Sequence, residues 1–176
     1  MQRIRLMALF IPLILMLVPA QAKAGLLFHA TKRSLAKRIL TRGFNPAKMS
    51  KHARFGKGVY FSRSRRTALR EKPGADTVVV FKDTKALKKR TIQVKGMNKS
   101  ELKAFSGDKD LRGNMRHGII GPSLGRKVGS RAGKANKSVI YPSAKDKRGT
   151  NVVIPSRVYR ENPRLIKPVR IDAYGK

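Results

Sequence analysis

The chain has 176 residues, of which 40% are hydrophobic and 29% are charged. This length suits one domain with a single hydrophobic core, and two full domains are not expected. Lysine and arginine number 42 against 9 aspartate and glutamate residues, which gives a formal net charge of +33, and cysteine is absent. The composition therefore excludes thiol chemistry, disulfides and cysteine-ligated zinc.

So large a positive charge must attract polyanions. Nucleic acid, anionic lipid, lipopolysaccharide and an acidic protein, such as an immunity or carrier protein, all meet that requirement. The basic residues are spread along the whole chain, without the aromatic motifs of an RNA-recognition sheet or the spacing of a zinc finger. The charge predicts salt-sensitive binding without naming a partner, and a merely solvated basic surface is the alternative.

Residues 1–24 have the pattern of a secretory signal peptide. Arg3 and Arg5 precede the apolar stretch Leu6–Val18, and Ala22-Lys23-Ala24 offers small residues for cleavage. About thirteen apolar residues are too few for a bilayer span, which needs roughly 20. We therefore expect export to the periplasm or the medium and no permanent membrane span; an uncleaved anchor embedded in lipid is the alternative.

The segment after residue 25 predicts a strand at Leu26–Phe28 and then a helix that Thr31 can cap and Gly43 can end. A polar loop over a cleft is expected at 45–54. Gly56 and Gly58 bracket the next strand, and Ser62 is expected to cap a helix that runs towards Arg70 and stops at Pro73-Gly74. A β-branched and aromatic strand follows at Thr77–Phe81.

The second half predicts a helical turn at 83–87, a strand at 91–94 and a short helix that begins near Ser100. Residues 107–137 carry many glycines and basic residues with little periodicity, which indicates a basic loop or insertion. Strands are expected at 138–141, 151–154 and 165–171. Short strands mixed with a few helices indicate an α+β domain over 25–176.

Two motifs about thirty residues apart carry the most chemical information. They are Leu27-Phe28-His29-Ala30-Thr31 and Phe55-Gly56-Lys57-Gly58-Val59-Tyr60-Phe61-Ser62. With Gly43-Phe44 between them and Ala68 after them, they resemble the NAD-binding core of the ADP-ribosyltransferase superfamily, in the branch typified by diphtheria toxin and the poly(ADP-ribose) polymerases. The resemblance covers Leu26 to about Phe81 and implies a split, mostly antiparallel sheet.

The resemblance implies NAD as substrate. His29 would bind the ribose, because an imidazole can donate to or accept from hydroxyl groups, and Tyr60 would stack on nicotinamide. Ala30 and Thr31 would lie beside the nicotinamide amide, Ser62 would line the pocket, and Gly56 and Gly58 would let backbone approach the ligand. Taken singly, His29 fits a hydrogen-bonded histidine at a strand end, and Tyr60 fits a core aromatic.

The third position of the family is an acidic residue at the start of a late strand. A carboxylate there steadies the oxocarbenium-like centre that forms when the bond between nicotinamide and ribose breaks. The matching stretch in this chain begins with Asn151, which cannot offset a cation by charge. Asp146, five residues upstream, is the alternative candidate, since the superfamily includes a His-Tyr-Asp branch; a solvated loop charge is its other interpretation.

No metal site is expected, because neither His52 nor His117 shows ligand spacing. Arg63, Arg65 and Arg66 could face the pyrophosphate of NAD or simply form an exposed basic helix face.

The combined pattern predicts an exported, toxin-like ADP-ribosyltransferase that modifies an anionic macromolecule, either an acidic protein or nucleic acid. One alternative is a catalytically inactive binding protein for polyanions or nucleic acid on the same fold. A weaker alternative is an RNA 2′-phosphotransferase, which shares the fold and the use of NAD.

Overall fold

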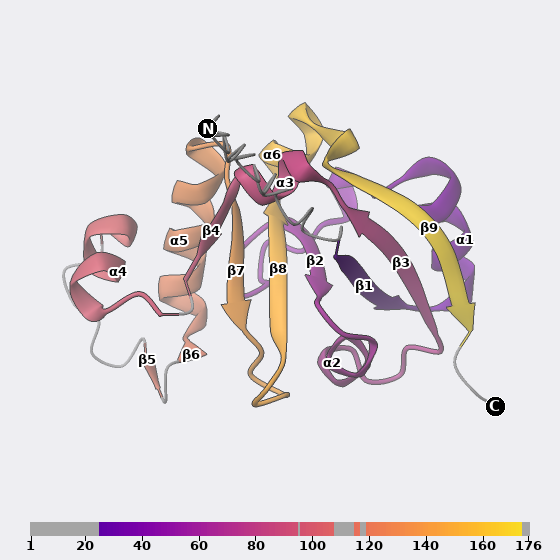
Figure 1. The fold of residues 1–176 in the computed structure, drawn as a ribbon, viewed down its shortest axis with the longest axis horizontal. Helices are drawn as coiled ribbons and strands as arrows, with labels where there is room; N and C mark the ends of the chain where they lie inside the picture. Colours follow the sequence, from indigo (N-terminus) through magenta and orange to yellow (C-terminus); the bar gives the residue numbers. More distant parts are fainter. Residues whose placement is uncertain (1–24, 95, 108–114, 117–118, 174–176) are drawn as a thin grey trace, which may run out of the picture.

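The computed structural model describes residues 25–94, 96–107, 115–116 and 119–173, so the predicted leader lies outside the described residues. In this part of the chain, seven strands form one mixed, mostly antiparallel sheet in the order β4-β7-β8-β2-β1-β3-β9 (Figure 1). These strands are β1 (Leu26–Thr31), β2 (Gly58–Ser62), β3 (Thr77–Asp83), β4 (Thr91–Gln93), β7 (Ser138–Pro142), β8 (Thr150–Pro155) and β9 (Ile166–Ala173). The expected α+β class is confirmed.

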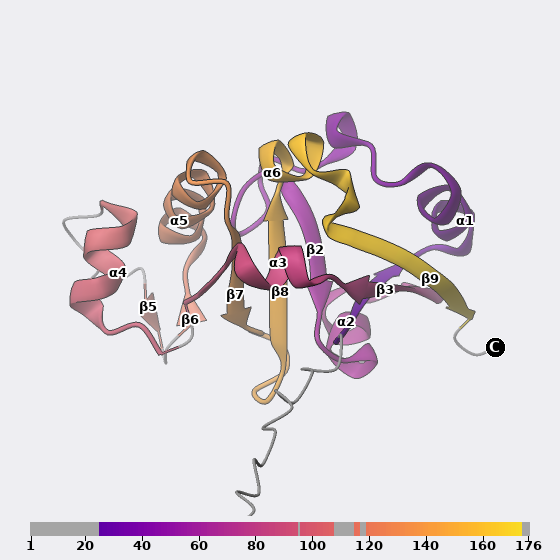
Figure 2. The same cartoon turned by 45° about the horizontal axis from the view of Figure 1, so that its top comes forward.

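Several short helices and a small second sheet surround the large one. The helices are α1 (Arg33–Arg42), α2 (Arg65–Glu71), α3 (Lys85–Lys89), α4 (Lys99–Ser106), α5 (Pro122–Lys134) and α6 (Ser156–Glu161). The small sheet pairs β5 (Met115–Arg116) with β6 (Ile119–Ile120). Helices α4 and α5 lie at one end of the large sheet, and α1 lies at the other end beside β9 (Figure 2).

The sheet is tightly paired except at one place. Strands β1 and β3 pair over six residues, β2 and β8 pair over five, and only β4 and β7 run parallel among the pairs described. Strands β1 and β2 share a single register pair, Phe28 with Ser62. The sheet therefore opens between β1 and β2.

Alternation along β2 sends its side chains into two separate cores. Val59 and Phe61 are buried in a cluster with Leu27 and Phe81, which α1 covers with the fully buried Ala36. On the opposite face, Tyr60 packs against a second cluster that includes residues of α5. Residues of β2 thus contribute to both cores.

Two expected helix starts are displaced. Thr31 remains in β1, and Lys32 precedes α1 without a side-chain cap; instead, the Asp76 carboxylate accepts a hydrogen bond from the Arg33 backbone N–H at 2.8 Å. Ser64, not Ser62, caps α2 and accepts from the Thr67 N–H at 3.1 Å. Ser62 therefore stays in β2 with its hydroxyl available for other contacts. Gly43 ends α1 as expected.

The expectation of an irregular loop over residues 107–137 is wrong for 122–134, which form α5. Its buried face contains Leu124, Val128 and Ala132, each followed directly by a glycine: Gly125, Gly129 and Gly133. A Cβ atom on Gly129 would lie 2.1 Å from the Phe55 carbonyl oxygen, so the glycines let the 54–55 backbone approach the helix axis. Residues 108–114 and 117–118 of the expected loop lie outside the described residues.

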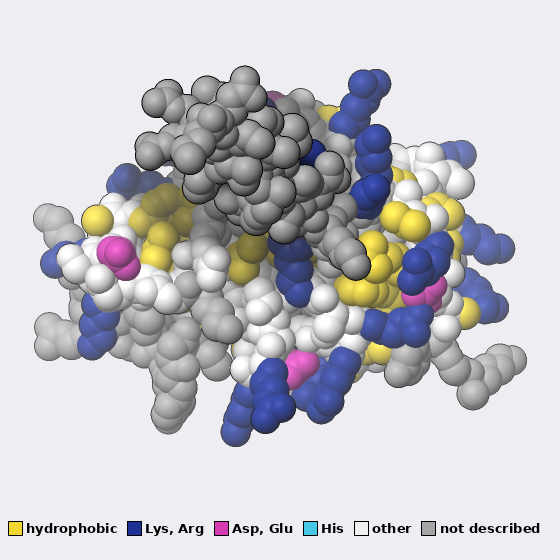
Figure 3. All heavy atoms as spheres, viewed as in Figure 1, with side chains coloured by type: hydrophobic (Ala, Val, Ile, Leu, Met, Phe, Trp, Pro, Cys, Tyr) yellow, Lys and Arg dark blue, Asp and Glu magenta, His cyan; other side chains and the backbone are white. Residues whose placement is uncertain are grey.

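Within the described ranges, no helix is long and apolar enough to cross a membrane. Lysine and arginine side chains occur on many parts of the face in Figure 3, and acidic side chains appear at isolated points between them. The positive charge is therefore spread over that face and is not gathered into one patch.

Candidate functional site

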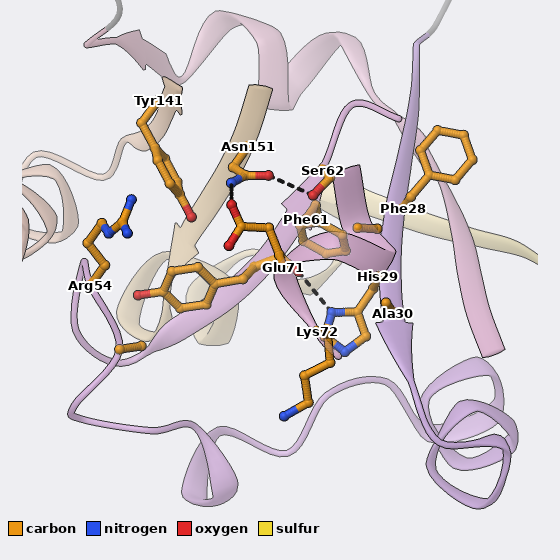
Figure 4. A pocket seen from close by; sticks show the side chains of 13 residues that line it. Phe28, His29, Ala30, Arg54, Phe61, Ser62, Glu71, Lys72, Tyr141 and Asn151 are labelled. Atoms are coloured by element: carbon orange, nitrogen blue, oxygen red, sulfur yellow. Dashed lines mark hydrogen bonds between the residues drawn. The ribbon is translucent and has the colours of Figure 1, made fainter. Parts of the chain in front are cut away.

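A cavity of about 370 Å³ lies at the opening between β1 and β2 (Figure 4). Its lining includes His29 and Ala30 from the first motif, Tyr60 and Ser62 from the second, and Asn151 from the late strand. Segments far apart in the sequence thus meet around one hollow because β1, β2 and β8 are consecutive strands of the sheet.

The His29 imidazole reaches from β1 to β2 across the opening, where the two strands share a single register pair. Its Nδ1 atom donates a hydrogen bond to the Tyr60 backbone carbonyl at 2.8 Å. Because a carbonyl oxygen only accepts, Nδ1 carries the hydrogen and Nε2 of the neutral ring keeps its lone pair. Edge-on contacts with Phe44 and Phe61, at centroid distances of 4.9 and 6.0 Å, fix the ring plane.

Burial lowers the pKa of His29 below its ordinary value of 6.5, against the opposing effect of the bond to Tyr60. The imidazole is consequently neutral at physiological pH. A neutral ring in this tautomer can accept a hydrogen bond from a ligand hydroxyl at Nε2.

The Tyr60 ring is fixed by its own loop. Its hydroxyl donates to the Gly56 carbonyl at 2.7 Å and accepts from the Phe55 N–H at 3.0 Å. Burial raises the pKa of Tyr60 to about 12, so the phenol is neutral. With the hydroxyl engaged, the ring remains as the part of the side chain that a ligand could contact in the cavity.

Four polar or aromatic residues form a row across three strand pairings, namely Tyr141, Asn151, Ser62 and Phe28. Directly paired residues lie on the same face of a sheet, and all four line the cavity. Burial raises the pKa of Tyr141, as do the neighbouring Tyr60 and Glu71, so its hydroxyl keeps its proton. That hydroxyl has no hydrogen-bond partner among the described residues.

Asn151 is buried and uses both ends of its amide. Its Oδ1 atom accepts from the Ser62 hydroxyl at 2.6 Å, and its Nδ2 atom donates to Glu71 Oε1 at 2.8 Å. The amide is therefore held in one orientation. It offers hydrogen bonds but no charge to the cavity.

Sequence reasoning missed Glu71, the carboxylate that lines this cavity. It is the last residue of α2, and Figure 4 shows its carboxylate next to Asn151. Its Oε1 atom also accepts from the Ser143 hydroxyl at 2.5 Å. No local sequence signal marked Glu71, because its contact with Asn151 joins residues that are 80 positions apart in the chain.

Asp146, the alternative acid, does not line the cavity. Its carboxylate accepts from the Thr67 hydroxyl at 2.8 Å and lies 3.5 Å from an Arg70 guanidinium nitrogen. The Thr67 hydrogen bond, with help from nearby arginines, holds the pKa of Asp146 below its ordinary value. These contacts tie the turn between β7 and β8 to α2.

A second cavity of about 780 Å³ adjoins the first and shares His29, Ala30, Tyr60 and Lys72 with it. Its lining also contains Thr31 and Gly58 from the expected site, apolar residues of α1, and the basic residues Arg38, Arg42 and Lys48. Gly56 lines neither cavity and occupies a turn with φ of 77°. The two cavities together form an extended basic crevice.

Two of the three arginines considered for pyrophosphate binding have structural partners. Arg63 pairs with the buried Asp83 at 2.5 Å, and Arg65 pairs with Asp172. His52 is exposed, and His117 lies outside the described residues. No cluster of His, Asp and Glu that could hold a metal ion occurs in the part of the chain that the structure describes.

No model of a known protein family matches the chain. A search of the curated proteins also gives no significant match. The function is therefore inferred from the geometry of the crevice and from the residues that line it.

Proposed function

We propose that the protein binds NAD and transfers its ADP-ribose group to an anionic macromolecule, with release of nicotinamide. The observation that carries the proposal is that His29 and Tyr60 line one cavity at the opening between β1 and β2. Had these side chains pointed into separate regions, the interpretation of the two motifs would have failed.

The chemical properties of the cavity support this reaction. The neutral His29 ring keeps an acceptor atom for a ribose hydroxyl, and the Tyr60 ring offers a surface for a flat aromatic group. The adjoining cavity, with Arg38, Arg42 and Lys48, has the size and the positive charge that the adenosine and diphosphate parts of NAD require.

The anionic target follows from the net charge of +33, which steers acidic proteins or nucleic acid towards the protein. Export and a dedicated immunity protein belong to the same proposal. They depend on the leader sequence at 1–24, which lies outside the described residues.

The test measures NAD binding by calorimetry and nicotinamide release by chromatography for the wild-type protein and for His29→Ala. Removal of the imidazole should lower nicotinamide release at least about 100-fold, the usual cost of a lost hydrogen bond to the reacting group. The matched control is His52→Ala, because His52 is exposed and lines neither cavity. Full activity of a folded His29→Ala protein would contradict the proposal.

A second candidate function is binding of polyanions without catalysis. It is favoured by the neutral Asn151 at the family's acidic position and by a groove of about 270 Å³ beside α5 that Lys57, Arg126 and Lys134 line. Tight, salt-dependent binding of an oligonucleotide without nicotinamide release would support this function over the transferase. Mass spectrometry of candidate targets incubated with the protein and labelled NAD would identify the acceptor of a transferase.

A further inference from the structure

The carboxylate of Glu71 is held at one oxygen and open at the other. Oε1 accepts hydrogen bonds from Asn151 Nδ2 at 2.8 Å and from the Ser143 hydroxyl at 2.5 Å. Among the described residues, Oε2 has no hydrogen-bond donor, and the side chain lines the cavity that His29 and Tyr60 share. Two fixed donors thus orient the group and leave one oxygen for a ligand.

Within the described residues, the Glu71 carboxylate also has no cationic side chain paired with it, although the protein is strongly basic. Arg54 and Lys72 line the same cavity, but no salt bridge joins either of them to Glu71 within the described ranges. The Lys145 ammonium contacts the Glu71 backbone carbonyl at 3.5 Å and not its carboxylate. A partly buried carboxylate without a counter-ion is costly, so its negative charge is available to a cationic group in the cavity.

The other acids of the described residues are used elsewhere. Asp83, Asp146 and Asp172 pair with arginines outside the cavity, and Glu161 pairs with Arg157 on α6. Asp76 accepts from the first turn of α1, and Glu101 completes the capping box of α4. Glu71 is therefore the one described acid that lines either part of the crevice.

We propose that Glu71 is the catalytic carboxylate of this site, supplied from the end of α2, and that Asn151 is a positioning residue that orients it. This inference rests on the proposed function. The carboxylate would take over the task of the acidic residue that β8 lacks at Asn151. Figure 4 shows Asn151 and Glu71 side by side, and both line the cavity with His29.

In the proposed reaction, ADP-ribose passes from NAD to an acceptor group of the target. The bond between ribose C1′ and the nicotinamide nitrogen breaks, its electron pair goes to that nitrogen, and neutral nicotinamide leaves. The positive charge that develops on the ribose is stabilised by the Glu71 carboxylate. The acceptor group then forms a bond to C1′ with its own electron pair, and its proton passes to Glu71 Oε2 and on to solvent.

The decisive variant is Glu71→Gln, in which the amide oxygen can still accept from Asn151 and Ser143. We expect kcat for nicotinamide release to fall at least about 100-fold while the Kd for NAD changes less than about threefold, because the charge acts on the transition state. His29→Ala differs, since it should weaken NAD binding as well. The matched control is Glu161→Gln, whose carboxylate is exposed and pairs with Arg157.

A second variant, Glu71→Asp, retains the charge and withdraws it by one methylene group. We expect kcat to fall about tenfold or more with NAD binding unchanged, since catalysis depends on the position of the charge. A kcat of either folded variant within threefold of wild type would overturn the role of Glu71 and leave the proposed transferase intact. Absence of nicotinamide release by the wild-type protein would overturn both proposals.

Discussion

The two edges of β2 differ sharply. On one edge, β2 pairs with β8 from Gly58 to Ser62 without interruption. On the other edge, it pairs with β1 only at Ser62, and the His29 side chain takes the place of a ladder bond by donating to the Tyr60 carbonyl. A single strand thus has one closed seam and one open seam.

The open seam lacks most of the backbone pairing that the closed seam has, and one of its carbonyls is satisfied by a side chain. Buried backbone groups need partners, so a gap inside a sheet is stable only when side chains or a ligand satisfy them. At the open seam, the His29 imidazole satisfies the Tyr60 carbonyl, and the two cavities lie beside it. At the closed seam, β2 and β8 pair backbone to backbone, and the Ser62 and Asn151 side chains at its end line the first cavity.

The largest effect is expected at the closed seam, from Gly58→Ala. A Cβ atom on Gly58 would lie 2.7 Å from the Ile154 carbonyl oxygen and 2.9 Å from a Val153 methyl group. The strands must separate to admit it, which should lower the free energy of unfolding by about 2 to 3 kcal/mol. Urea denaturation measures the change.

Gly56→Ala serves as the control for this prediction. Gly56 has φ of 77° and no atom within 4 Å of an added Cβ, so the substitution costs only the left-handed conformation, about 1 kcal/mol. Equal losses in the two variants would show that β2 and β8 are not packed as closely as described. From the sequence, Gly58 was expected to let backbone approach a ligand. In the structure, the backbone that its missing side chain admits is that of β8.

A smaller effect is expected from the polar contacts that connect the closed seam to the cavity. Asn151→Ala leaves the Ser62 hydroxyl and Glu71 Oε1 each without one partner, which should cost about 1 to 2 kcal/mol of stability. A double-mutant cycle with Glu71→Ala, which removes the accepting oxygen, should give a coupling free energy of about 1 kcal/mol. Additive losses within error would show that Asn151 does not orient Glu71.

Much of the fold was predictable because the strands carry local signals. β-Branched and aromatic runs marked β3, β7 and β8, and Gly43 marked the end of α1. Helix α5 was missed because glycine is a poor helix former and its usual meaning is a turn. The overlooked signal was spacing, since Leu124-Gly125, Val128-Gly129 and Ala132-Gly133 repeat every four residues.

Only the candidate site residues that lie within a short sequence motif could be predicted. His29 and Tyr60 were each recognisable within a short segment, and the structure brings them to one cavity. Glu71 and Asn151 are 80 residues apart in the sequence, and their contact depends on how α2 packs. No local sequence pattern could therefore predict it. Asp146 was a candidate because it is close to Asn151 in sequence. In the structure, the turn after β7 places its carboxylate against the Thr67 hydroxyl.

The pH dependence of stability tests whether His29 seals the open seam as a neutral ring. Its pKa is lowered by burial in the folded protein, so the unfolded chain takes up a proton first as the pH falls below the ordinary value of 6.5. The stability that the neutral imidazole contributes is complete above pH 6.5 and declines as the pH falls towards the lowered pKa. This effect is the smallest of the three near neutral pH.

Comparison with His29→Gln isolates this effect, because a glutamine amide can donate to the Tyr60 carbonyl but does not titrate in this range. His52 and His117 are present in both proteins, so any contribution from them cancels in the difference between the two. The stability of wild type relative to His29→Gln should therefore be greater at pH 7.5 than at pH 5.5, as measured by urea denaturation at each pH. A difference that stays constant, or grows on acidification, would mean that the ring is protonated or solvated in the folded state, and that the open seam is closed by some other contact.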